Sequence, residues 1–118
     1  MAPTRELQPA IFSSLAADPL LADLVAEFVT DLPVRIARLK RQFAAHDWPG
    51  LNRTAHQLKG AAGSYGFEEI TPHAHRIELL LAQNAQPKAV GEAVHEFVVH
   101  CQRITAGVPP HPVTPQRT

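Results

Sequence analysis

A histidine on a glycine-lined helical face is the part of this sequence best suited to chemistry. The stretch from Ala55 to Gly66 has the residue pattern of a helix, yet Gly60 and Gly63 lie inside it. An interior glycine costs a helix about 1 kcal/mol relative to alanine, so helix stability is given up at both positions. At about 100° per residue, both glycines fall within roughly 40° of His56 around the helix axis. The pattern predicts an imidazole presented on a bare strip of surface that another macromolecule can approach.

Cationic residues flank this histidine on the same helix. Lys59 lies about 60° to one side of His56, and Arg53 lies about 60° to the other. Neutral imidazole is nucleophilic and well populated near pH 7. A lysine three residues further along the helix can reach a negatively charged group attached to that ring. These residue types predict a phosphoryl acceptor, with Gly60 and Gly63 leaving the line of attack clear.

A metal site has weak support, although the chain contains seven histidines. His95 and His100 are five residues apart, which separates them by about 140° around a helix. His73 and His75 are two apart and point to opposite sides. Cys101 falls in an apolar stripe, where a small buried side chain is the ordinary explanation. Surface histidines account for these residues better, and we expect no intrinsic metal or cofactor.

Two enzymatic alternatives are also unsupported. Ser64 follows His56 by eight residues, which is about 12 Å along a helix and too far for a nucleophile and its base. No glycine-rich phosphate loop precedes a helix, so an ATP site is not indicated. We therefore expect a protein that is not an enzyme and has no kinase activity of its own.

The composition favours one small domain in the cytoplasm. The chain has 118 residues and carries 11 basic and 11 acidic side chains. A neutral, mixed charge distribution gives little support for binding nucleic acid or an anionic membrane. One cysteine excludes an internal disulfide and fits a reducing compartment. No run approaches the roughly 20 apolar residues that span a bilayer, and the N-terminus lacks the apolar segment of a signal peptide.

Periodic apolar residues predict an all-α fold without strands. We expect a polar lead-in over 1–8, a helical domain over 9–107 and a proline-rich, disordered tail over 108–118. The predicted helices are a short one from Pro9 to Ala17, a long one starting at Asp18-Pro19 and bent near Pro33, one from Asp47 to about Ser64, one from Thr71 to Asn84, and one from Pro87 to Gly107. Short loops then predict an antiparallel up-down bundle of four main helices with the short N-terminal helix added. We expect Arg35, Arg38, Lys40 and Arg41 to form a solvated face.

At this point the sequence resembles a known family. His56-Gln57-Leu58-Lys59-Gly60, five further residues and Gly66 are similar to the His-x-Leu-Lys-Gly-x5-Gly signature of histidine phosphotransfer (HPt) domains. Further similarity lies in the segment from Phe28 to Leu39 with its proline, the turn at Asp47-Trp48, and the stretch from Arg76 to Leu79. The resemblance covers roughly Asp18 to Ile104 and implies a four-helix bundle, in agreement with the periodicity.

The resemblance implies a phosphoryl relay. His56 would be phosphorylated at Nε2, Lys59 would stabilise the phosphoryl group, and Gly60 and Gly66 would leave room for the partner. We extend this access role to Gly63 and expect flanking contacts from Arg53 and Gln57. The implied partner is the receiver domain of a response regulator or of a hybrid sensor histidine kinase, with Mg²⁺ bound on the receiver. We expect a monomer.

Two other functions compete with the relay. The protein could keep this fold as an adaptor that docks on receiver domains without carrying phosphate, although such an adaptor does not need an exposed imidazole at position 56. It could also be the phosphorylatable domain of a chemotaxis kinase, which normally belongs to a much longer chain. The sequence does not identify the cognate kinase and regulator or the direction of phosphoryl flow.

Overall fold

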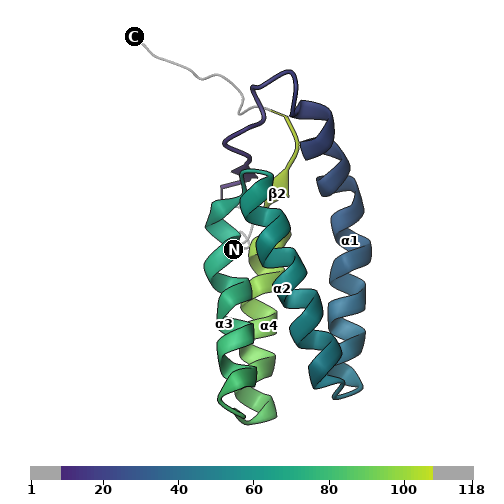
Figure 1. Cartoon of the computed structure of the whole chain (residues 1–118), viewed down its shortest axis with the longest axis vertical. Coiled ribbons are helices and arrows are strands. Elements are labelled where there is room, and N and C mark those ends of the chain that lie inside the picture. The colour runs from purple at the N-terminus through teal and green to yellow at the C-terminus, as the bar shows by residue number, and fades with distance from the viewer. Residues whose placement is uncertain (1–8, 108–118) are drawn as a thin grey trace, which may run out of the picture.

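The computed structural model describes residues 9–107 and is mostly helical, as the sequence predicts. Its order is β1 (Ile11–Phe12), α1 (Ala22–Ala44), α2 (Trp48–Ser64), the short 3₁₀ helix η2 (Glu68–Ile70), α3 (Thr71–Ala82), α4 (Pro87–Cys101) and β2 (Ile104–Thr105) (Figure 1). The expected lead-in over 1–8 and tail over 108–118 lie outside the described residues.

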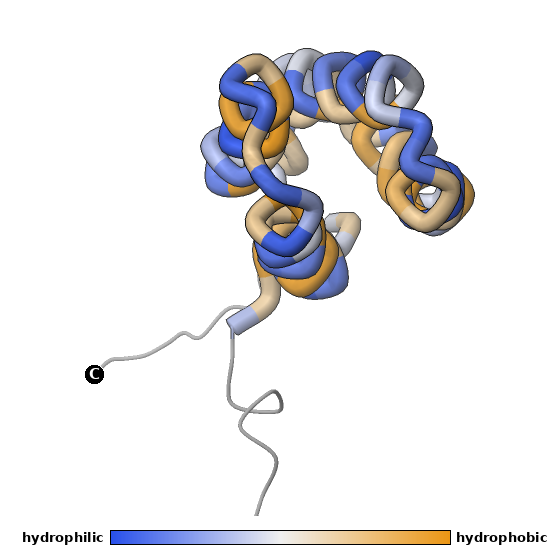
Figure 2. The backbone as a smooth tube through the Cα atoms, turned by 90° about the horizontal axis from the view of Figure 1, so that it is seen from below, coloured by the Kyte–Doolittle hydropathy of each residue, from blue (hydrophilic) through white to orange (hydrophobic). Residues whose placement is uncertain are grey.

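Four helices pack around one apolar core. Seen end-on, they form an arc in which α2 and α3 lie between α1 and α4 (Figure 2). The largest fully buried side chains come from all four helices and from the segment between α2 and α3: Phe67, Phe97, Leu39, Leu51, Leu58, Ile70, Ile77, Val25 and Val90. No helix within residues 9–107 has both the length and the hydropathy needed to cross a bilayer.

Helix α1 is continuous through a proline. Val25, Phe28, Leu32 and Leu39 are its buried residues and keep the expected three- and four-residue spacing. Pro33 lies inside the helix, is exposed, and lacks the N–H that an interior helical residue would donate. The predicted start at Asp18-Pro19 was three residues too early. Asp18 instead makes a turn, in which its carboxylate accepts a hydrogen bond from the Leu20 N–H at 2.9 Å and its carbonyl accepts from Leu21 and Ala22.

Helix α2 has the predicted bounds because its signals are local. The Asp47 carboxylate accepts a hydrogen bond from the Gly50 N–H at 3.1 Å and caps the first turn, where Pro49 needs no donor partner. Gly66 follows the helix with φ of 83°, a backbone conformation that glycine adopts without a Cβ clash. Leu51, Ala55, Leu58 and Ala62 form the buried face.

The N-terminal segment corrects the predicted fold. The helix expected from Pro9 to Ala17 was wrong, and so was the expectation that the chain has no strands. β1 instead pairs in parallel with β2, with Ile11 opposite Ile104 and Phe12 opposite Thr105. The Ile11 N–H donates to the Arg103 carbonyl at 2.7 Å. Two-residue strands are too short to show an alternating pattern, and this pairing joins the two ends of the described chain.

Candidate functional site

The buried face of α2 determines where His56 points. Ala55 and Leu58 are fully buried against the other helices, so the intervening turn presents His56 outward, and 68% of its side-chain surface is exposed. A Cβ built on Gly60 would meet nothing within 4 Å, and one on Gly63 would come no closer than 4.0 Å, to Thr71 Oγ1. The helix surface beside the imidazole is therefore bare at both predicted glycines.

Glu78 of α3 reaches this surface and contacts both predicted site residues. Its Oε2 lies 2.7 Å from His56 Nδ1, and its Oε1 lies 2.6 Å from Lys59 Nζ. The Glu78 side chain is 16% exposed, whereas His56 is 68% exposed. The carboxylate thus lies at the base of the site, between the histidine and the lysine. Glu78 was not among the predicted site residues.

The ionisation of Glu78 determines which nitrogen of a neutral His56 ring carries the proton. Burial tends to raise the pKa of this carboxyl group, but its contacts with Lys59 and His56 and their positive charge outweigh burial, and the pKa is lowered. Glu78 is therefore ionised at neutral pH and can accept hydrogen bonds but not donate them. In the neutral imidazole ring, His56 Nδ1 must therefore be the nitrogen that carries the proton, which leaves the lone pair on Nε2. That nitrogen is on the far edge of an exposed ring.

Lys59 is less free than the sequence predicts. Its side chain is 26% exposed and is held by Glu78, so its ammonium group is positioned near the imidazole before any phosphoryl group arrives. His75, one turn before Glu78 on α3, adds a second ring to the cluster. Its Nδ1 lies 3.5 Å from Lys59 Nζ and 3.7 Å from Glu78 Oε1. The sequence analysis did not place His75 at the site either.

The remaining predicted residues divide into two groups. Arg53 and Gln57 are both exposed residues of α2, and their flanking contacts stay a prediction. Gly66 is buried at the end of the helix, and a Cβ there would collide with the hydroxyl groups of Ser13 and Ser14. The space beside Gly66 is filled by the N-terminal segment, so the partner-access role expected for Gly66 does not fit this geometry.

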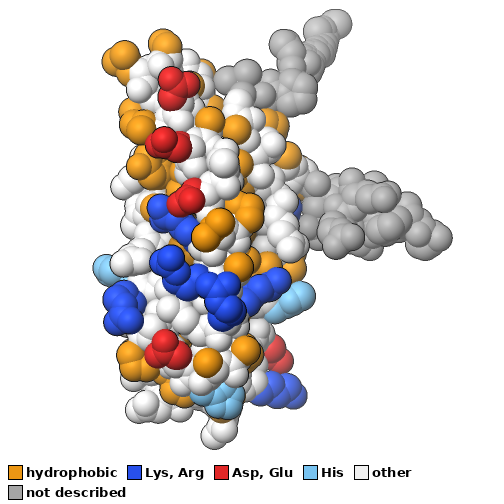
Figure 3. Space-filling model, turned by 90° about the vertical axis from the view of Figure 1, so that its right-hand side faces the viewer, with side chains coloured by type: hydrophobic (Ala, Val, Ile, Leu, Met, Phe, Trp, Pro, Cys, Tyr) orange, Lys and Arg blue, Asp and Glu red, His pale blue; other side chains and the backbone are white. Residues whose placement is uncertain are grey.

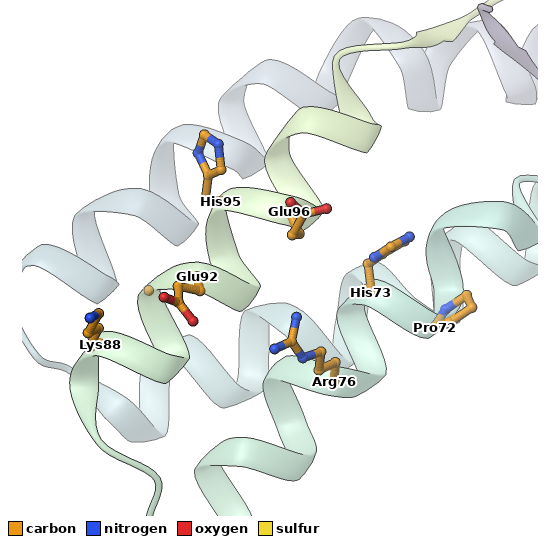
Figure 4. Close-up of a pocket in the computed structure, with 8 residues that line it drawn as sticks. Pro72, His73, Arg76, Lys88, Glu92, His95 and Glu96 are labelled. Atoms are coloured by element: carbon orange, nitrogen blue, oxygen red, sulfur yellow. The ribbon is translucent and has the colours of Figure 1, made fainter. Parts of the chain in front are cut away.

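Within residues 9–107, the histidines other than His56 and His75 do not contact this cluster. His73 and His95 line a groove of about 850 Å³ between α3 and α4, together with Pro72, Arg76, Lys88, Gly91, Glu92 and Glu96 (Figure 4). His73 also stacks on His100, with ring centroids 3.8 Å apart. Within residues 9–107, no group of three or more His, Cys, Asp or Glu side chains is arranged to hold a metal ion. Cys101 is buried, which raises the pKa of its thiol to about 12.

A comparison with protein families identifies the domain that contains this cluster. The family model described as Hpt domain matches residues 23–107, which is most of the chain and includes α2 and α3 with the whole cluster. The curated proteins and the solved structures give no match. Hpt domains are phosphocarrier modules of two-component phosphorelays, and they interact with receiver domains and histidine kinases. The chain belongs to the Hpt domain family.

Proposed function

We propose that this protein relays a phosphoryl group between His56 Nε2 and the aspartate of a receiver domain in a multistep two-component relay. The observation that carries the proposal is the hydrogen bond of 2.7 Å between His56 Nδ1 and Glu78 Oε2, beneath a ring that is otherwise exposed. It supports Nε2 as the nucleophilic atom, because the proton is held on the opposite nitrogen. The proposal includes the antiparallel up-down order of the four helices, which the course of the ribbon supports (Figure 1).

The phosphoryl transfer needs no added acid or base. The Nε2 lone pair attacks phosphorus of the aspartyl phosphate, the N–P bond forms, and the P–O bond to the aspartate breaks. The aspartate leaves as a carboxylate, and the imidazole ring keeps its Nδ1 proton and becomes cationic. Glu78 then stabilises this charge across the same hydrogen bond. The reverse step returns the phosphoryl group to an aspartate through the same atoms.

Lys59 stabilises the phosphoryl group in this mechanism. Its ammonium group lies 2.6 Å from Glu78 Oε1, and its flexible stem can carry it from that carboxylate toward the negative charge of a phosphoryl group on Nε2. Phosphoryl transfer depends mostly on positioning and on charge stabilisation, to which a divalent metal commonly contributes. We propose that Mg²⁺ is bound by the receiver and that this domain has no cofactor of its own. The protein would act as a cytoplasmic monomer without kinase activity.

Labelled phosphate tests the function directly. The protein is incubated with Mg²⁺ and a phosphorylated receiver or an active hybrid kinase, and the label is followed. We expect acid-labile, alkali-stable label that is absent from His56→Gln, while Lys59→Ala slows transfer and leaves the fold intact. Undiminished label in His56→Gln would refute the site. Receiver binding without any label on the wild-type protein would favour the adaptor.

A further inference from the structure

The two sides of His56 carry different charge. On the α3 side, Glu78 already holds Lys59 in an ion pair. On the other side is α1, whose acidic residues Asp23, Glu27 and Asp31 precede its basic residues Arg35, Arg38, Lys40 and Arg41. Figure 3 shows the α1 side of the molecule, where Lys and Arg side chains form a band across the middle, below a column of acidic side chains. Positive charge therefore gathers at one level along the helices.

Two of these cationic residues, Arg35 and Arg38, line a cavity. It has a volume of about 350 Å³ and lies between α1 and α2, lined by Asp31, Val34, Arg35, Arg38, Thr54, Gln57 and Leu58. Gln57 directly follows His56 on α2, so the cavity lies beside the helical turn that carries the imidazole, on the side facing α1. Val34 is 60% exposed although it is a large apolar residue. An apolar contact surrounded by polar groups is typical of the centre of a protein interface.

Of the two arginines in this cavity, Arg38 is the one without an ion-pair partner among residues 9–107. The Arg35 Nε lies 3.2 Å from Asp31 Oδ2, and its guanidinium lies 5.7 Å from the centre of the Phe28 ring, so Arg35 is already engaged. Within residues 9–107, Arg38 makes no ion pair or side-chain hydrogen bond. Lys40 is on the same helix but lines a different groove, between α1 and α4. The basic residues that the sequence placed on one solvated face thus line two different grooves, with Arg35 and Arg38 in one and Lys40 in the other.

We infer that the receiver docks with an acidic surface against this α1–α2 cavity, with Val34 as the apolar contact and Arg38 as the residue that selects and orients the partner. This inference rests on the proposed function. The occupant follows from charge complementarity, because a phosphorylatable aspartate that binds Mg²⁺ is surrounded by carboxylates. On the α3 side, Lys59 is already paired with Glu78, so that side offers less uncompensated positive charge to the same surface. Rim charges mainly govern encounter and partner choice, so Arg38 determines specificity and is not a catalytic residue.

Charge reversal at Arg38 tests the inference, with Lys40→Glu as the matched control on the same helix. His56 is first loaded with phosphoramidate, which needs no docking surface, and transfer is then followed to the receiver that accepts fastest in a panel. We expect Arg38→Glu to load like the wild type but to raise the KM for that receiver by about tenfold, with little change in the rate at saturation. Lys40→Glu should match the wild type, and Arg38→Lys should recover most of the affinity.

The outcomes separate this inference from the function on which it rests. If Arg38→Glu and Lys40→Glu have equal effects on the KM, general charge attraction explains binding and the inference is overturned. If Arg38→Glu lowers the saturated rate with an unchanged KM, Arg38 acts in the chemistry and the assigned role is wrong. If loaded wild-type protein transfers to no receiver, the relay function itself fails.

Discussion

Neutralising Glu78 should slow phosphoryl transfer while leaving receiver binding intact. In Glu78→Gln the group facing His56 Nδ1 loses its charge, so it no longer fixes the tautomer or stabilises the cationic ring. Hydrogen bonds to charged groups contribute about 1.5–3 kcal/mol, and the lower end applies because 68% of the His56 side chain is exposed. A loss of about 1.4 kcal/mol corresponds to a tenfold lower rate at saturating receiver.

The assay pairs transfer kinetics with nitrogen NMR of the imidazole. In the wild type we expect the neutral His56 ring to carry its proton on Nδ1, and in Glu78→Gln we expect a shift toward the Nε2–H form. The KM for the receiver should change little. The free energy of unfolding should change by less than about 1 kcal/mol, because the ion pairs that Glu78 makes are near the surface. Glu92→Gln, in the groove between α3 and α4, is the control. A wild-type rate in Glu78→Gln would refute the role of Glu78.

Three further perturbations test other parts of the structure. Gly60→Ala should raise the free energy of unfolding by up to about 1 kcal/mol, because the new Cβ enters open space, and thermal melts measure this change. The same substitution should slow phosphoryl transfer if the receiver occupies that space, which transfer rates measure. Gly66→Ala should destabilise by about 1–3 kcal/mol, since φ is 83° and the new methyl group meets Ser13; a denaturant midpoint equal to that of the wild type would contradict this. The pKa of His73 is lowered by burial and by His100, against the opposing charge of Glu96. The folded state therefore binds this proton more weakly than the unfolded state does. The contribution of His73 to the free energy of unfolding is fully present above about pH 6.5 and is lost as the pH falls through the lowered pKa. In thermal melts from pH 7 to 5, His73→Phe should make the melting temperature depend less on pH.

Local signals made α2 and its reactive face predictable. Asp47 caps the helix from three residues away, and the buried positions of α2 recur with helical spacing. The exposure of His56 follows from this periodicity alone. The position of Gly66 after the helix was also predictable, but its close neighbours were not. They belong to a segment about fifty residues earlier in the chain, whose Ser13 hydroxyl donates to the Tyr65 carbonyl at 2.5 Å.

Tertiary contacts explain what the sequence could not give. Glu78 is 22 residues from His56, and its reach depends on how α3 packs against α2. The sequence did offer one signal, because Glu78 directly follows Ile77, which is buried in α3. A carboxylate that is partly removed from water needs a cationic partner, and this could have pointed to Lys59 or His56. The N-terminal error has the same origin. Ile11 and Phe12 have apolar spacing compatible with a helical turn, and their strand partner lies more than ninety residues away.

The phosphorylated atom is the most direct test of the relay. The protein is loaded with phosphoramidate, and the phosphohistidine is assigned by phosphorus and nitrogen NMR. We predict one phosphohistidine, at Nε2 of His56, with the Nδ1 proton retained toward Glu78. Phosphorylation of His56 at Nδ1, or of another histidine in place of His56, would contradict the account.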